Sequence, residues 1–144
     1  MREILFRGKC SETGKWYTGQ YINLHKTTYC FKEDYDRFKD NDIHQIVFEQ
    51  MTDWGLPNQH LRVDVIPETI GQYTGLTDKN GTKIFEGDIV KHSIGTFVVK
   101  FLNGTFLSSL TEDNYLSFLC EIHNQCKVIG NIHDNPELLK EREG

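Results

Sequence analysis

The sequence predicts a mainly β fold of the α+β class, in which short strands joined by tight turns are accompanied by one or two short helices. Six of the twelve glycines fall between Gly71 and Gly104. Asn80-Gly81 and Asn103-Gly104 are strong hairpin signals, because both residue types accept a positive φ. Short strand-like runs also recur at about ten-residue spacing, which is typical of a small barrel or sandwich.

In the first part of the chain, runs rich in β-branched and aromatic residues predict strands. These runs cover residues 4–8, 15–22, 27–31 and 61–65. The polar stretch from Lys32 to Asp42 is predicted to be a loop. Residues 43–51 leave two alternatives open. Their apolar residues fit helical spacing with Asn41 or Asp42 as the cap, whereas a strand through residues 46–48 is the other interpretation.

The second part of the chain gives clearer signals, because turns separate its apolar runs. Strands are predicted at residues 74–77, 82–85, 89–91, 97–101, 105–107 and 127–132. Thr111 is expected to cap a helix whose first turn holds two acids, as the helix dipole prefers. The apolar face of that helix would comprise Tyr115, Phe118, Leu119 and Ile122. Asn135-Pro136 predicts a short final helix that includes Leu138 and Leu139.

Composition and charge exclude several classes of protein. The 144 residues include 16 basic and 21 acidic side chains, for a net charge of −5. No run approaches the roughly 20 apolar residues of a membrane helix, so no membrane partner is expected. Nucleic acid is disfavoured as a partner because neither half of the chain is basic. A series of four lysines is the only candidate basic patch, and we interpret it as a solvated sheet face: Lys79, Lys83, Lys91 and Lys100.

The cysteines and histidines do not form a recognisable reactive site. The four cysteines are Cys10, Cys30, Cys120 and Cys126. The first residues show no export signal, so we expect a cytoplasmic location in a bacterial host, with reduced thiols. Cys120-x2-His123-x2-Cys126 lacks the usual spacing of zinc ligands, and neither a metal nor a cofactor is predicted. No nucleophile elbow, His-Glu-x-x-His or phosphate loop occurs, so a non-enzymatic protein is predicted.

Three segments carry a resemblance to a known family. They are Met1–Gly8, Gln72–Val90 and Val128–Leu139. In this order, the segments resemble the YopX-like proteins of phages and prophages. The resemblance implies an SH3-like β-barrel portion and self-association, and it implies no catalytic residues.

With this resemblance, the chain is expected to have three parts. Residues 1–67 would form an N-terminal β-containing subdomain, residues 68–135 the SH3-like barrel portion, and residues 136–144 a short helix and tail. The expected function is that of a phage or prophage binding module that contacts its own copies and a host or phage protein. A nucleic-acid-binding accessory protein is the alternative, and a small hydrolytic enzyme is a weaker one.

The residues of the resembling segments fall into two groups. Most have a structural interpretation as turn or packing residues, because they permit positive φ, close approach or side-chain bonds to the backbone. This group comprises Gly75, Asn80, Gly81, Gly87, Asp88, Gly130, Asn131, Asn135 and Pro136. The second group is polar or aromatic and lies near predicted turns at one barrel end, where it would suit a partner or small ligand. The candidate binding residues are Gln72, Tyr73, Asp78, Lys79 and Glu86.

Overall fold

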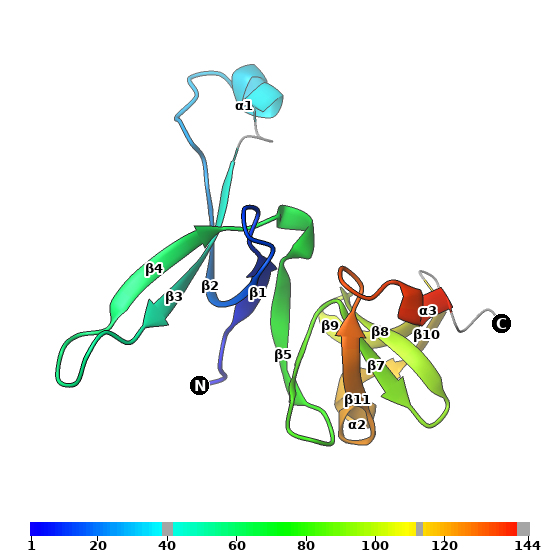
Figure 1. Ribbon diagram of the computed structural model, residues 1–144. Helices are drawn as coiled ribbons and strands as arrows, with labels where there is room; N and C mark the ends of the chain where they lie inside the picture. The colour runs from blue at the N-terminus through cyan, green and yellow to red at the C-terminus, as the bar shows by residue number, and fades with distance from the viewer. Residues whose placement is uncertain (39–41, 112–113, 141–144) are drawn as a thin grey trace. The chain divides into compact units, whose positions relative to one another are not determined.

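The chain divides into two compact units, each of which has its own strands (Figure 1). The computed structural model describes residues 1–38, 42–111 and 114–140. The N-terminal unit is Leu5–Ile70, and the C-terminal unit combines Met1–Ile4 with Gly71–Gly144. This division lies close to the boundary expected after residue 67. The expected division into residues 1–67, 68–135 and 136–144 stays a prediction.

The N-terminal unit is an antiparallel meander in which sequential strands pair with one another. Its strands are β1 (Phe6–Lys9), β2 (Trp16–Leu24), β3 (Ile43–Gln50) and β4 (Gln59–Asp64). Helix α1 (Lys32–Phe38) lies between β2 and β3, and the 3-10 helix η2 (Pro67–Thr69) follows β4. Ile46 lies opposite Tyr21 on one side and Val63 on the other. It is fully buried, so it anchors the centre of this sheet.

The C-terminal unit contains a β5–β6 pair and a five-stranded antiparallel sheet in the order β10-β9-β8-β7-β11. The strands are β5 (Gly71–Thr77), β6 (Lys83–Phe85), β7 (Asp88–His92), β8 (Gly95–Leu102), β9 (Thr105–Thr111), β10 (Asn114–Phe118) and β11 (Lys127–Asn131). Short helices α2 (Leu119–Ile122), η3 (His123–Gln125) and α3 (Glu137–Lys140) complete the unit. The fully buried core comprises Ile84, Val90, Phe97, Val99, Leu119 and Cys126. Among the strands of the described residues, no pairing joins β10 to β11, so the sheet is open.

The mainly β class is confirmed, but the local predictions for residues 27–38 are wrong. Residues 27–31 form no strand, and α1 occupies most of the stretch predicted to be a loop. The helix has Glu33 and Asp34 in its first turn and Arg37 in its last turn. These charges lie where the helix dipole favours them, and this signal outweighs the polar character of the stretch.

Residues 43–50 form a strand, so the helical interpretation of this segment is wrong and the alternative is confirmed. The helical spacing of the apolar residues did not decide the structure, because β3 pairs with β2 on one side and β4 on the other. Only alternate positions of a strand face the same way, and Ile46 is the fully buried one. Tertiary pairing therefore overrides the local pattern.

The helix expected after Thr111 is also wrong over most of its length. Residues Asn114–Phe118 continue the sheet as β10, paired with β9, and helix α2 begins only at Leu119. The β9–β10 ladder has two register irregularities. Such bulges interrupt the regular alternation that marks a strand in a sequence, which explains why helical spacing was found there instead. The two acids predicted for its first turn, Glu112 and Asp113, lie outside the described residues.

Candidate functional site

The five candidate binding residues do not form one exposed surface. Tyr73 is buried, and its ring packs against Phe85 with centroids 5.6 Å apart. The Nζ of Lys83 lies 5.3 Å from the centroid of the Tyr73 ring. An ammonium ion over an aromatic face is a favourable contact, so Tyr73 has a packing role in the β5–β6 pair.

Asp78 is also buried, and its carboxylate is occupied by the backbone. Oδ1 accepts hydrogen bonds from the N–H groups of Asn80 and Thr82, each at 2.9 Å, and Oδ2 accepts one from Val128 at 3.0 Å. Burial alone would raise the pKa of Asp78, but these three donors and the nearby charge of Lys127 hold it below its usual value. The residue is therefore a charged structural centre of the turn after β5.

Of the other three candidates, Lys79 lies in this turn, Gln72 lies in β5 before it, and Glu86 follows β6. Gln72 and Glu86 are half-buried, and the backbone N–H of Glu86 donates to the carbonyl of Gln72 at 2.9 Å. Lys79 is exposed, and its backbone N–H donates to the carbonyl of Cys126 at 3.0 Å. Of the five residues, Lys79 alone is exposed, so a shared binding role for the set stays a prediction.

The turn residues make the backbone contacts that tight bends require. Asp88 is buried, and its Oδ2 accepts a hydrogen bond from the N–H of Phe85 at 2.8 Å. Gly87 between them has a φ of 89°, a conformation that side chains with a Cβ rarely adopt. Gly75 and Gly81 have positive φ as well. The hydrogen bond of Asp88 and the positive φ of Gly87 together define the bend from β6 into β7.

A second group of turn residues shapes the end of β11. The Oδ1 of Asn131 accepts hydrogen bonds from the N–H groups of His133 at 3.0 Å and Asp134 at 2.9 Å. Asn135 lies so close to Gly130 that an added Cβ would be 2.6 Å from its Oδ1. Pro136 then precedes α3, where its fixed φ suits the start of a helix.

The four lysines of the series lie on different elements, namely the turn after β5 and the strands β6, β7 and β8. Lys83 pairs with Glu3 at 2.9 Å, and Lys91 lies opposite Lys127 in the β7–β11 ladder. The three residues considered as metal ligands have different surroundings. Cys126 is buried and Cys120 is exposed, while the Nδ1 of His123 lies 2.7 Å from the carbonyl oxygen of Thr77. Within residues 1–38, 42–111 and 114–140, no three metal-ligating side chains cluster.

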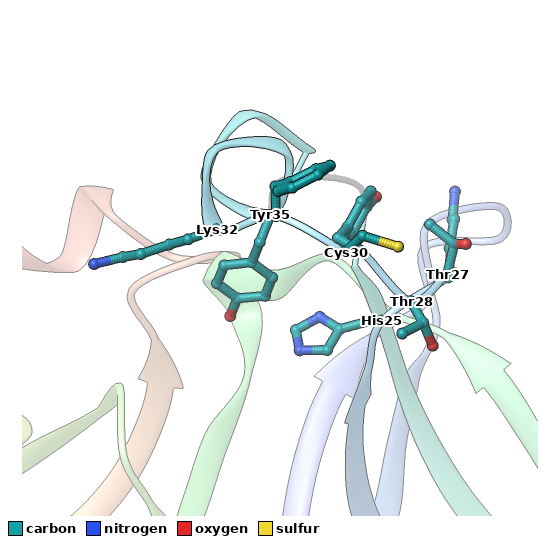
Figure 2. Close-up of a pocket in the computed structure, with 9 residues that line it drawn as sticks. His25, Thr27, Thr28, Cys30, Lys32 and Tyr35 are labelled. Carbon is teal, nitrogen blue, oxygen red and sulfur yellow. The ribbon is translucent and has the colours of Figure 1, made fainter.

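The sequence interpretation missed a different surface, formed by the segment between β2 and β3. We call residues 25–38 the aromatic insert. It lines an open pocket of about 650 Å³, and the lining includes His25, Tyr29, Cys30, Phe31 and Tyr35. In Figure 2 the rings of Tyr35 and His25 lie beside the same space, and the side chain of Lys32 extends away from them. The aromatic residues scattered through this polar stretch were the available signal, but they were assigned to a strand and a loop.

Ring contacts hold the aromatic insert together. The His25 and Tyr35 rings meet edge to face at 5.0 Å, and Tyr29 stacks on Phe38 at 5.9 Å. Phe31 remains 69% exposed, while Tyr35 and Phe38 are 38% and 39% exposed. Exposed rings that gather on one segment, in contrast to apolar residues scattered singly, are a feature of interaction sites.

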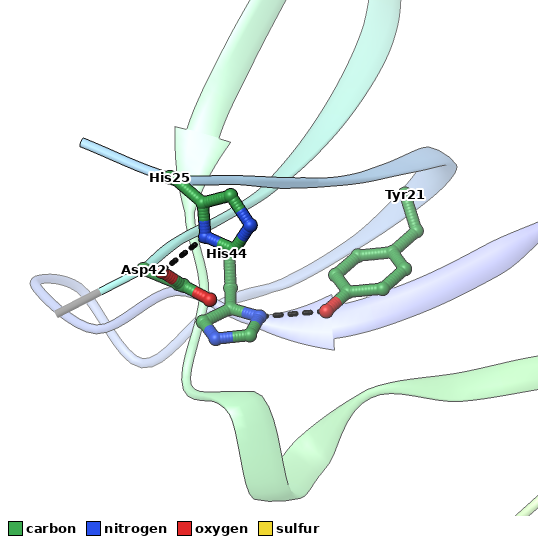
Figure 3. A network of polar contacts seen from close by, with 4 residues as sticks. All are labelled: Tyr21, His25, Asp42 and His44. Atoms are coloured by element: carbon green, nitrogen blue, oxygen red, sulfur yellow. Dashed lines mark hydrogen bonds and ion pairs between the residues drawn. The ribbon is translucent and has the colours of Figure 1, made fainter. Parts of the chain in front are cut away.

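Two polar pairs lie at the base of the aromatic insert (Figure 3). The Nδ1 of His25 is 2.8 Å from Oδ1 of Asp42, which joins the first residue of the insert to the residue before β3. The hydroxyl of Tyr21 lies 2.6 Å from Nδ1 of His44. Burial, followed by the charge of Asp42, raises the pKa of the Tyr21 hydroxyl, so it is protonated at neutral pH. These pairs connect the insert to strands β2 and β3.

Comparison with known proteins decides the family. The pattern of the family described as YopX protein matches residues 5–140, nearly the whole chain. The protein belongs to the YopX family. The resemblance predicted from three segments is thereby confirmed, and the match to YopX also spans the aromatic insert.

A solved structure is similar to this YopX-family chain. The crystal structure of protein EF1440 from Enterococcus faecalis is 25% identical to it, with a TM-score of 0.50. The similarity covers 96% of this chain and 99% of that chain. No curated protein matches the chain. Among the described helices, none has the length and apolar character needed to cross a membrane.

Proposed function

We propose that this YopX-family chain is a phage or prophage protein that works in the bacterial cytoplasm as a non-enzymatic binding module. It associates with its own copies and contacts a host or phage protein. The observation that carries the proposal is the exposed aromatic insert between β2 and β3. The proposal also interprets the C-terminal unit as an open relative of the SH3-like barrel.

The composition of the insert supports a protein partner. Tyr and Phe side chains dominate the energetics of protein interfaces, because they bury a large apolar area with few rotatable bonds. Phe31 is the most exposed ring of the insert, and it lines the pocket together with Tyr35. Burial of these rings by a partner would remove apolar surface from water, at about 25 cal/mol for each Å².

The two alternatives differ in what they require of the insert. Helix α1 carries Glu33, Asp34 and Asp36 against Lys32 and Arg37, so it does not offer the positive surface that nucleic acid needs.

For a small hydrolytic enzyme, Asp42 orients His25 beside a pocket that Cys30 also lines. A thiol, an imidazole and a carboxylate are the groups of an acyl-transfer site. Hydrolysis that Cys30→Ser and His25→Asn both abolish would favour this alternative.

The test compares two equally exposed apolar residues in affinity capture from the bacterial host. Phe31→Ser removes the insert's exposed ring, and Ile94→Ser is the matched control, because Ile94 is 65% exposed on the β7–β8 turn. We expect a defined protein that survives nuclease treatment and is lost with Phe31→Ser but retained with Ile94→Ser. Release by nuclease would favour the nucleic-acid alternative, and equal capture by both variants would contradict the assignment to the insert.

Self-association requires its own measurement. Native mass spectrometry of the wild-type chain should show species above the 16.8 kDa monomer. A monomer at every concentration would contradict this part of the proposal and leave the heterologous partner to be judged by the capture experiment.

A further inference from the structure

We propose that the end of the β3–β4 hairpin is a second docking element, which inserts Trp54 into an apolar pocket with a basic rim on a partner protein. We call residues 51–58 the hairpin tip. This proposal goes beyond the function proposed above, because it concerns a surface separate from the aromatic insert and does not depend on it.

The ladders of the N-terminal unit show that the hairpin separates from β2 before its own end. Strand β2 pairs with β3 only as far as Val47, opposite Gln20. The β3–β4 ladder continues beyond that point and ends with Gln50 opposite Gln59. Five of the six residues of β4 are exposed. A two-stranded ribbon with most of its side chains in solvent is only marginally stable by itself, so a partner bound at this end would stabilise it.

Hydrogen bonds hold the hairpin tip in a compact turn. The N–H of Trp54 donates to Oδ1 of Asp53 at 2.8 Å, and the N–H of Leu56 donates to the carbonyl of Asp53 at 3.1 Å. The hydroxyl of Thr52 donates to the carbonyl of Pro57 at 3.0 Å. A turn that is ordered before binding has less conformational entropy to lose when a partner engages it.

This ordered turn displays apolar side chains to solvent. Trp54 is 97% exposed, Met51 76% and Leu56 60%. Tryptophan is the residue type most enriched among interface hot spots, where it occupies a pocket surrounded by weaker contacts. One large exposed ring and two smaller exposed apolar side chains within the hairpin tip fit that description, with Trp54 as the anchor.

The charges around the tip select the partner's chemistry. Asp53 is the charged residue of the hairpin tip itself, and Glu49 beside the tip has its Oε1 3.7 Å from Nε2 of His60. The segment from Ile43 to Leu61 contains no lysine or arginine. Phosphate backbones and anionic bilayers would be repelled by these carboxylates, whereas a basic rim would be attracted. A second copy of the chain is a poorer match than a basic partner, because the chain carries a net charge of −5.

The experiment places a photo-crosslinking amino acid, p-benzoylphenylalanine, at position 54 of the full chain in the bacterial host. We expect one discrete protein adduct that excess wild-type chain prevents and excess Trp54→Ser chain does not. The adduct should persist when Phe31→Ser is combined with the crosslinker, since the tip acts independently of the insert. A parallel crosslinker at position 94 should not give this adduct.

The crosslinked protein is then purified and its affinity measured. Trp54→Ser should weaken binding about 30-fold or more, as the loss of a hot spot does, while Ile94→Ser should leave it unchanged. Asp53→Asn combined with Glu49→Gln should slow association and reduce its salt dependence. Circular dichroism checks that each variant is folded.

Every other outcome overturns the proposal. An adduct at twice the 16.8 kDa chain mass would assign the tip to self-association, and adducts to lipid or nucleic acid would assign it to those partners. Absence of any adduct, or equal weakening by Trp54→Ser and Ile94→Ser, would show that the tip is not a docking element. None of these results bears on Phe31, so the two proposals fail separately.

Discussion

The carboxylate of Asp78 and the backbone N–H of Val128, fifty residues apart in sequence, are joined by a hydrogen bond of 3.0 Å. The same carboxylate also accepts bonds from Asn80 and Thr82. One buried side chain therefore fixes the turn after β5 to the first residues of β11. Asp78 and Val128 belong to two of the segments that carry the resemblance to the YopX family, Gln72–Val90 and Val128–Leu139.

Removal of this carboxylate should destabilise the C-terminal unit. Asp78→Ala would leave three N–H groups without their acceptor, and we expect a loss of about 3 kcal/mol or more in the free energy of unfolding. Asp78→Asn keeps one acceptor oxygen and should cost less, about 1–2 kcal/mol. Urea titration, together with amide hydrogen exchange in β11, measures both effects. Unchanged protection of the Val128 amide would contradict this role.

The stability difference between wild type and Asp78→Asn should depend on pH. Because the pKa of Asp78 is lower in the folded chain than its usual value of 3.8, the folded state favours the ionised carboxylate. This stabilisation is fully present above the pKa of the unfolded chain and is lost as the pH falls through the lower, folded-state pKa. We expect the gap measured at pH 7 to narrow at pH 3. A gap of constant size would show that charge is not the cause.

Much of the C-terminal unit could be predicted from the sequence, because its turns depend on local chemistry. Asn80-Gly81 and Asn103-Gly104 form tight turns where they were expected, and Gly81 and Gly104 have positive φ. The long-range role of Asp78 could not be predicted, since nothing in the turn sequence indicates that Val128 lies beside it. Sequence reasoning placed Asp78 among the candidate binding residues near the turns at one barrel end.

The N-terminal unit was harder to predict because tertiary pairing decides its local structure. The apolar spacing around Ile46 fits a helix equally well, and only the pairing with β2 and β4 selects a strand. The two candidate docking surfaces were missed for a related reason. Exposure is a property of the folded chain, and neither Phe31 nor Trp54 differs in sequence pattern from an aromatic residue of a core.

Gly19→Ala should disrupt the β2–β3 ladder. An added Cβ at this position would overlap the backbone carbonyl oxygen of Val47, which cannot move without separating the two strands. We expect a loss of about 3 kcal/mol in the free energy of unfolding, at the upper end of overpacking effects. Amide hydrogen exchange in β2 and β3 should accelerate in parallel, which places the damage in this sheet.

A second glycine provides the control for this substitution. Gly55 in the hairpin tip has a φ of 77°, and an added Cβ there would meet no atom within 4 Å. Gly55→Ala should therefore cost only the backbone strain of a positive φ, about 1 kcal/mol. Equal destabilisation by the two substitutions would show that steric overlap with Val47 is not the cause.

The four free cysteines should fall into two groups that differ in their rate of reaction with a thiol reagent. Cys30 and Cys120 are exposed, whereas Cys10 and Cys126 are buried, and all four are free. Burial, with a smaller contribution from the charge of Asp78, raises the pKa of Cys126, so its thiolate is doubly disfavoured at neutral pH. A thiol reagent followed by intact mass measurement should modify two cysteines in the folded chain and all four in urea. Rapid modification of Cys126 in the folded chain would contradict the position of this residue in the core.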